Sequence, residues 1–276
     1  MILFYQIKEA KFCCGVTRME KTFLLSHEEL NIFCRQSQPD CGEIRQVVLG
    51  VHGLCGSSED EIQVDVAEEM EIFGAATLRF DFPGHGESPM SDAYLTLSNC
   101  KRSLMAVAAY AREQYPQVED LCIFASGFGA YITLLCLEAL VQMPGNIRLV
   151  VQKPDIMMHE TLLNMKRISH PTFQAMESIT FRTDRLLTVS YSFYEELQEN
   201  VALFSCPIPM LILFGEHDDY VSMEHVREFR QINEQTKLVI IPGTSYHLRE
   251  RDASNTVLDL TRDWFEFQQV LVTEWE

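Results

Sequence analysis

Short apolar runs alternate along this chain with stretches that have helical periodicity. Apolar runs of buried-strand character occur at residues 46–51, 75–80, 121–125, 147–152, 210–214 and 237–241. Between these runs, as in residues 97–115, apolar positions recur every three to four residues, which is typical of amphipathic helices. Strands that alternate with helices in this way predict an α/β fold with a doubly wound, mostly parallel sheet. A chain of 276 residues is long enough to form it as one large domain.

Two segments depart from the alternation. Residues 22–26 and 29–35 are short strand-like runs joined by a polar turn, and they predict an antiparallel hairpin. Residues 153–204 are rich in Met, Leu, Phe and Tyr, show few strand signals, and are too long for a plain crossover. We therefore expect a core domain formed by residues 1–152 and 205–276, with residues 153–204 inserted after the sixth predicted strand as a helical lid. Met-rich apolar surface suits varied apolar ligands.

The strongest local signal is a strand, a turn of small residues and a helix in direct succession. It reads Leu121-Cys-Ile-Phe-Ala-Ser-Gly-Phe-Gly-Ala-Tyr-Ile-Thr-Leu134. This context is typical of the nucleophile elbow, where the motif Gly-x-Ser-x-Gly holds a reactive serine on a strained turn. Here the nucleophile position is held by Gly127, which adopts positive φ at little cost but has no reactive atom. A shifted register with Ser126 as nucleophile is the alternative, although it places Phe124 and Phe128 where small residues are needed.

Three further loops follow predicted strands, at the edge where parallel strands present their carboxyl ends to ligands. The first, His52-Gly-Leu-Cys-Gly-Ser-Ser58, has glycines that let backbone N–H groups point at an oxyanion. The second, Gly215-Glu-His-Asp-Asp-Tyr-Val221, brings carboxylates past a strand end, and the third, Pro242-Gly-Thr-Ser-Tyr-His247, does the same for a histidine. Elbow, acid and histidine follow one another in the chain order of the triad in α/β-hydrolases.

Together with Arg79-Phe-Asp-Phe-Pro-Gly-His-Gly-Glu-Ser88, these motifs resemble the α/β-hydrolase superfamily. Within it the chain is similar to capped bacterial esterases of the cinnamoyl or feruloyl esterase type, over roughly residues 20–272. The resemblance implies an α/β-hydrolase fold in which Asp218 is the triad acid and His247 the triad base. Asp219 is a neighbour that could replace Asp218, although the motif spacing favours Asp218.

The resemblance also implies an oxyanion hole formed by the backbone N–H groups of Leu54 and Phe128, with Gly127 in place of the nucleophile. Without a serine hydroxyl no acyl-enzyme forms, so we expect a serine esterase-like protein that is weakly active or inactive and binds a small acyl or aromatic ester-like molecule. Two alternatives stay open. One is an active hydrolase in which His247 activates water or Ser126 attacks, and the other is a protein-interaction module that uses the apolar lid.

Charge and cysteine content narrow the possible partners. The formal net charge of −18 argues against nucleic acids and anionic membranes, which bind clustered Lys and Arg. The first ten residues lack signal-peptide character, and no window approaches 18 uninterrupted apolar residues. Nine scattered cysteines without a Cys-x-x-Cys motif indicate reduced thiols rather than a zinc site. We expect a cytoplasmic protein without metal or cofactor, and the sequence leaves the oligomeric state open.

Overall fold

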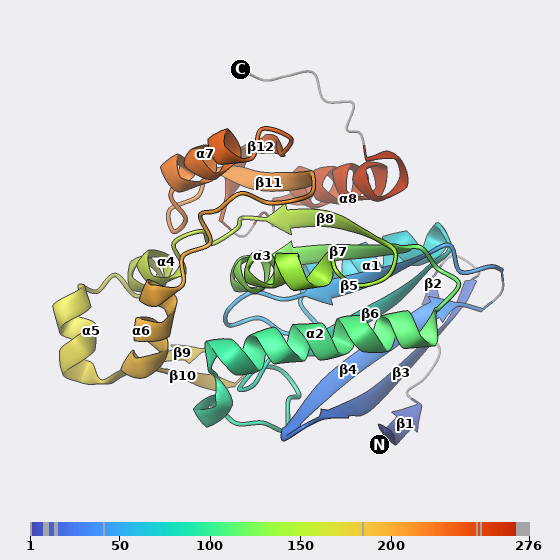
Figure 1. Ribbon diagram of the computed structural model, residues 1–276, viewed down its shortest axis with the longest axis horizontal. Helices are drawn as coiled ribbons and strands as arrows, with labels where there is room; N and C mark the ends of the chain where they lie inside the picture. Colours follow the sequence, from blue (N-terminus) through green and yellow to red (C-terminus); the bar gives the residue numbers. More distant parts are fainter. Residues whose placement is uncertain are drawn as a thin grey trace.

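The computed structural model describes residues 2–7, 11–13, 16–40, 42–183, 185–246, 248 and 250–268. Within these residues a ten-stranded sheet forms the centre of the molecule (Figure 1). Its strands are, in spatial order, β1 (Ile2–Ile7), β3 (Val16–His27), β4 (Leu30–Pro39), β6 (Ala75–Asp81), β5 (Gln46–Val51), β7 (Asp120–Ser126), β8 (Asn146–Gln152), β11 (Met210–His217) and β12 (Lys237–Ser245), while β2 (Lys11–Cys13) pairs with β3.

The sheet has an antiparallel part and a parallel part. Strands β5, β6, β7, β8, β11 and β12 run parallel to one another, which confirms the doubly wound sheet predicted from the six apolar runs. The predicted hairpin is β3–β4, and its strands are longer than expected. Strand β4 continues through a polar stretch to Pro39 because it pairs with β3 on one side and β6 on the other. Backbone hydrogen bonds on both sides outweigh the weak strand propensity of this stretch.

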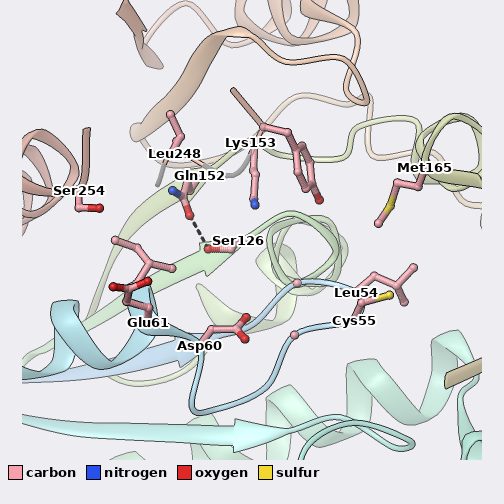
Figure 2. Close-up of a pocket in the computed structure, with 14 residues that line it drawn as sticks. Leu54, Cys55, Asp60, Glu61, Ser126, Gln152, Lys153, Met165, Leu248 and Ser254 are labelled. Atoms are coloured by element: carbon pink, nitrogen blue, oxygen red, sulfur yellow. Dashed lines mark hydrogen bonds between the residues drawn. The ribbon is translucent and has the colours of Figure 1, made fainter. Parts of the chain in front are cut away.

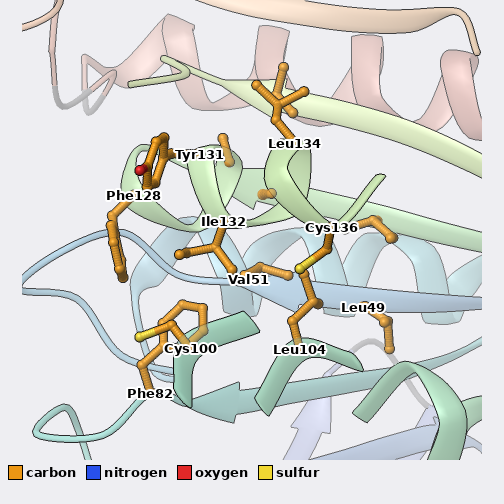
Figure 3. Close-up of a cluster of buried hydrophobic side chains, with 14 of the residues drawn as sticks. Leu49, Val51, Phe82, Cys100, Leu104, Phe128, Tyr131, Ile132, Leu134 and Cys136 are labelled. Carbon is orange, nitrogen blue, oxygen red and sulfur yellow. The ribbon is translucent and has the colours of Figure 1, made fainter. Parts of the chain in front are cut away.

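Helices cover both faces of the sheet. The helices α2 (Leu97–Gln114), α3 (Phe128–Leu140) and α7 (Met223–Ile232) pack on one face, and α1 (Glu61–Ile72) and α8 (Arg251–Phe267) pack on the other. Strand β5 shows how the sequence builds both cores, since Leu49 and Val51 face the α2–α3 side and Val48 faces the α1–α8 side. Figure 3 shows Leu49 and Val51 below α3, with Leu104 of α2 close by. None of the helices in the described part of the chain is long and apolar enough to span a bilayer.

Helix α3 lies unusually close to the sheet. A Cβ built on Gly129 would overlap the backbone oxygens of Val51 and His52, so only glycine fits there. This close packing brings the amino end of α3 against the loop that follows β5. Gly129 is the second glycine of the elbow motif, and its lack of a side chain allows this close contact between helix and strand.

The segment between β8 and β11 contains more than helices. It holds α4 (Met158–Lys166), α5 (His170–Met176), β9 (Ser178–Arg182), β10 (Leu186–Ser190) and α6 (Tyr191–Glu199), with a short 3₁₀ turn, η1 (Asp92–Tyr94), beside it. The helices were expected, but the β9–β10 hairpin was not. Strand β9, with the sequence SITFR, alternates polar and apolar residues as a half-buried strand does, but the expectation of helices rested on the apolar content of the whole segment. Figure 1 shows this segment at one end of the sheet, next to the amino end of α2.

Candidate functional site

Gly127 occupies the sharp turn between β7 and α3. Its backbone angles are φ 50° and ψ −117°, a region that non-glycine residues rarely adopt. Its N–H donates to the Gln152 carbonyl at 3.0 Å, and its own carbonyl accepts from the Tyr131 N–H at 3.0 Å. The turn therefore has the strand, strained residue and helix of a nucleophile elbow, with a hydrogen atom in place of the reactive side chain.

Ser126 is the last residue of β7 and its hydroxyl is engaged. The Oγ donates to Gln152 Oε1 at 2.8 Å, and Gln63 Nε2 approaches the same Oγ at 3.5 Å (Figure 2). The side chain is buried beside the strand rather than presented at the tip of the turn. This geometry explains Ser126 as a structural residue, while its expected alternative role as nucleophile remains a prediction.

The histidine of the loop after β5 ties this loop to Phe82, which follows β6. The Nδ1–H of His52 donates to the Gly53 carbonyl at 2.8 Å, which leaves Nε2 to accept the Phe82 N–H at 3.1 Å. The Cα of Gly53 lies 3.9 Å from the point where a Cβ on Gly127 would be. Among the described residues, the N–H groups of Leu54 and Phe128 have no acceptor. Their expected role as an oxyanion hole stays a prediction.

Two oxygen atoms border the space that a serine side chain would fill at position 127. A Cβ built there would lie 3.1 Å from the hydroxyl oxygen of Tyr246 and 3.3 Å from Oδ2 of Asp155. Asp155 follows β8 and Tyr246 follows β12, so both come from strand ends at the same edge of the sheet. Sequence reasoning missed both residues, although an acid soon after a strand end is the same signal that selected Asp218.

Asp155 is fully buried. Burial raises the pKa of this carboxyl to about 8 because it disfavours the charged form. The Lys153 ammonium lowers the pKa, the Asp218 carboxylate raises it further, and the nearby Thr161 side chain lowers it slightly. At neutral pH Asp155 is therefore mostly a carboxylic acid, which can donate a hydrogen bond.

Asp218 caps the turn after β11. Its Oδ1 accepts the N–H groups of Tyr220 and Val221, both at 2.9 Å, whereas Oδ2 has no partner among the described residues. Burial raises the pKa of Asp218, and the two backbone hydrogen bonds oppose that shift. His247 lies outside the described residues, so the pairing of Asp218 with His247 stays a prediction.

Lys153 places a cation at this site. It has a positive φ of 45°, and its Nζ lies 3.9 Å from the centroid of the Tyr246 ring. The same ring makes an edge contact with Tyr220, with the ring centroids 4.9 Å apart. Burial raises the pKa of the Tyr246 hydroxyl well above its ordinary value, and Asp155 and Asp218 raise it further. The Tyr246 hydroxyl therefore stays protonated and can donate.

A small cavity of about 150 Å³ opens beside the elbow (Figure 2). Leu54, Ser126, Lys153, Met165 and Tyr246 are among the residues that line it. Met165 belongs to α4, so the segment between β8 and β11 contributes a wall. The carboxylates of Asp60 and Glu61 also line it, so the cavity is polar as well as apolar. No group of three or more His, Cys, Asp or Glu side chains in the described ranges is arranged to hold a metal ion.

The sheet order, the elbow and the loop after β5 define the α/β-hydrolase fold. No protein-family model and no curated protein sequence matches this chain. Solved structures, by contrast, match most of the chain. Est1E from Butyrivibrio proteoclasticus, solved with ferulic acid bound, matches with a TM-score of 0.76 and 19% identity over 89% of this chain and 98% of its own.

Two further structures agree with this assignment. A putative hydrolase from Agrobacterium vitis S4 matches with a TM-score of 0.74 and 15% identity, over 91% of this chain and 99% of its own. The mouse alpha/beta hydrolase domain-containing protein 10 matches with a TM-score of 0.73 and 16% identity, over 90% and 100%. These likenesses confirm the α/β-hydrolase fold predicted from the motifs.

Proposed function

We propose that this protein is an esterase-like α/β-hydrolase that has lost its serine nucleophile and binds a small acyl or aromatic ligand at the elbow. The observation that carries the proposal is Gly127, which adopts the strained elbow conformation, φ 50° and ψ −117°, without a reactive side chain. A strained turn is retained only when the surrounding structure imposes it. Here the hydrogen bond to Gln152 and the packing of α3 impose it.

The missing hydroxyl limits the chemistry. Without Oγ no acyl-enzyme can form. An oxyanion hole and substrate binding alone leave a residual rate of roughly 10³–10⁴-fold over water in enzymes stripped of their triad. In this proposal the amides of Leu54 and Phe128 form that hole, and Asp218 and His247 are retained without a nucleophile to activate.

The segment between β8 and β11 is proposed to act as a lid over this site, with residues 1–152 and 205–276 as the core domain. The lining of the cavity by Met165 supports this division. The cavity volume of about 150 Å³ supports a ligand with a single small acyl or aromatic group. The free thiols at Cys34, Cys100 and Cys122 suit a reducing compartment, which supports a cytoplasmic location.

Ester hydrolysis by the protein and by its Gly127→Ser variant tests the proposal, with short-chain and aromatic acyl esters as substrates. We expect the protein to show no burst and no covalent adduct. The variant is expected to gain the mass of one acyl group, measured on the intact protein after rapid quenching. The same variant with Ser126→Ala is the matched control and should still be acylated.

Three outcomes would contradict the proposal. Turnover by the unmodified protein that His247→Ala abolishes would show an active enzyme that uses water. Turnover or acylation abolished by Ser126→Ala would assign the nucleophile to Ser126. If neither the protein nor Gly127→Ser reacted with or bound any ester, the site would not be a vestige of an esterase site.

A further inference from the structure

We propose that the cavity beside the elbow binds a small aminoacyl ligand, whose positively charged amino group is held by the carboxylates of Asp60 and Glu61 and whose carbonyl accepts a hydrogen bond from Gln152. This inference rests on the proposed function and names the ligand class of that site. It is carried by the lining of the cavity, by two carboxylates without a cationic partner and by a buried amide nitrogen without an acceptor.

Two consecutive carboxylates at the start of α1 line the cavity. Both Asp60 and Glu61 border its volume of about 150 Å³. Oδ1 of Asp60 accepts the Ser57 N–H at 3.1 Å, and among the described residues neither carboxylate forms an ion pair. The helix dipole favours acids at this end of a helix, but it does not require them to face a cavity. Their place in the lining gives them a second possible role, in binding a cation.

The lysine that lines the cavity is engaged away from these carboxylates. Nζ of Lys153 lies 3.9 Å from the centroid of the Tyr246 ring, and its charge lowers the pKa of Asp155. Figure 2 shows Lys153 on the opposite side of Ser126 from the two carboxylates. The described lining therefore has a negative side that no protein cation neutralises, and this side favours a cationic group on the ligand.

The amide of Gln152 is an independent sign of a ligand. Its side chain lines the same cavity and is only 1% exposed. Oε1 accepts the Ser126 hydroxyl at 2.8 Å, whereas Nε2 has no hydrogen-bond partner among the described residues. In Figure 2 this nitrogen points away from Ser126. Because native proteins rarely leave a buried donor unpaired, we infer that a ligand oxygen accepts from it.

An aminoacyl group combines the two features that this lining requires. Its ammonium carries a positive charge and three donors for Asp60 and Glu61, and its carbonyl, attached to the same carbon atom, accepts from Gln152. A plain acyl group has no donor for the carboxylates, and an amine without a carbonyl leaves the amide unpaired. The cavity of about 150 Å³ restricts the ligand to a small aminoacyl group such as alanyl.

Calorimetric titration of the full-length protein with three small probes tests the proposal. L-Alanine methyl ester carries both the ammonium and the carbonyl, methyl isobutyrate has a methyl group in place of the ammonium, and isobutylamine has the cation without the carbonyl. At about pH 6 we expect the alanine ester to bind at least about tenfold more tightly than either of the others. Its advantage over methyl isobutyrate should shrink with added salt, because salt screens charge interactions near the surface.

Three variants assign the contacts. Asp60→Asn and Glu61→Gln remove charge but keep the shape of the side chain, so each should weaken binding of the alanine ester by about fivefold or more and leave methyl isobutyrate unchanged. The side-chain oxygen in Asp60→Asn can still accept the Ser57 N–H, so the loop should persist. Gln152→Leu removes the unpaired donor and should reduce the affinity for the alanine ester to that for isobutylamine.

Asp65→Asn is the matched control, because Asp65 lies on the same helix and does not line the cavity. It should bind all three probes as the unmodified protein does. Equal affinity for the alanine ester and methyl isobutyrate, or an affinity for the alanine ester that survives both Asp60→Asn and Glu61→Gln, would overturn the aminoacyl assignment alone. Failure of both esters to bind the folded protein would overturn the proposed function with it.

Discussion

Asp155 and Gly127 face one another across the elbow, with Oδ2 of the aspartate 3.3 Å from the place of a missing Cβ. The two residues come from neighbouring strands, since β8 lies next to β7 and the backbone N–H of Gly127 binds the carbonyl of Gln152 at the end of β8. The hydroxyl oxygen of Tyr246 borders the same position and lies 3.1 Å from the place of that Cβ. The vacated position is therefore bordered by two polar groups rather than being an open gap.

A side chain at position 127 should cost stability for two reasons. Gly127→Ala would be strained at φ 50° and ψ −117°, and its Cβ would crowd the oxygens of Tyr246 and Asp155. We expect a loss of about 1–3 kcal/mol, measured by urea unfolding. Gly243→Ala is the control, because Gly243 has φ +67° but nothing within 4 Å of its Cβ position. Equal losses for the two variants would show that crowding at the elbow contributes nothing.

Replacing Asp155 should stabilise the protein increasingly as pH rises. Its carboxyl has a pKa of about 8 in the folded state against an ordinary value of 3.8, so between these values the folded state holds a proton that the unfolded state has released. The stability of the unmodified protein therefore falls as pH rises through this range, whereas Asp155→Asn has no such group. The gap in melting temperature should widen from about pH 4 to about pH 8 and then level off. A constant gap would mean that Asp155 titrates normally.

Ser126 is expected to matter for stability and not for activity. Ser126→Ala removes the hydrogen bond to Gln152 Oε1 and should cost about 1 kcal/mol in urea unfolding. Any ester hydrolysis should be unchanged. Ser103 offers a comparison, since its buried Oγ has no hydrogen-bond partner in the described ranges and Ser103→Ala should be close to neutral. Loss of hydrolysis with unchanged stability in Ser126→Ala would instead make Ser126 the nucleophile.

Asp218 should be needed for ester hydrolysis by the Gly127→Ser variant and hardly needed for folding. In Asp218→Asn the side-chain oxygen can still accept the N–H groups of Tyr220 and Val221, so the turn after β11 should persist. In the Gly127→Ser background, loss of this negative charge should lower ester hydrolysis by about 10²–10⁴-fold if Asp218 orients His247. Asp219→Asn, at an exposed neighbour, is the control and should retain the rate. If both variants lost the rate equally, the acid assignment would be wrong.

The amino-acid sequence by itself determined the α/β-hydrolase fold and the place of the elbow. Buried parallel strands must be nearly continuous apolar runs, and the elbow needs small residues such as Gly127 and Gly129 at set spacings. Both requirements act locally, so they are legible in the sequence. The β9–β10 hairpin was not predicted, because the alternation in β9 lies within a long apolar segment whose composition favours helices.

Only the tertiary structure decided which side chains meet at the vacated position. Asp155 follows β8 and Tyr246 follows β12, two strands that are separated by β11 in the sheet, and the sequence does not show that their side chains meet. Their oxygens converge on Gly127 because the strands end at one edge and the loops turn inward over the elbow. The pKa of Asp155 likewise follows from burial, which depends on every element packed around it. Proximity and desolvation are properties of the packed chain, so they appear only once the strands have been brought together.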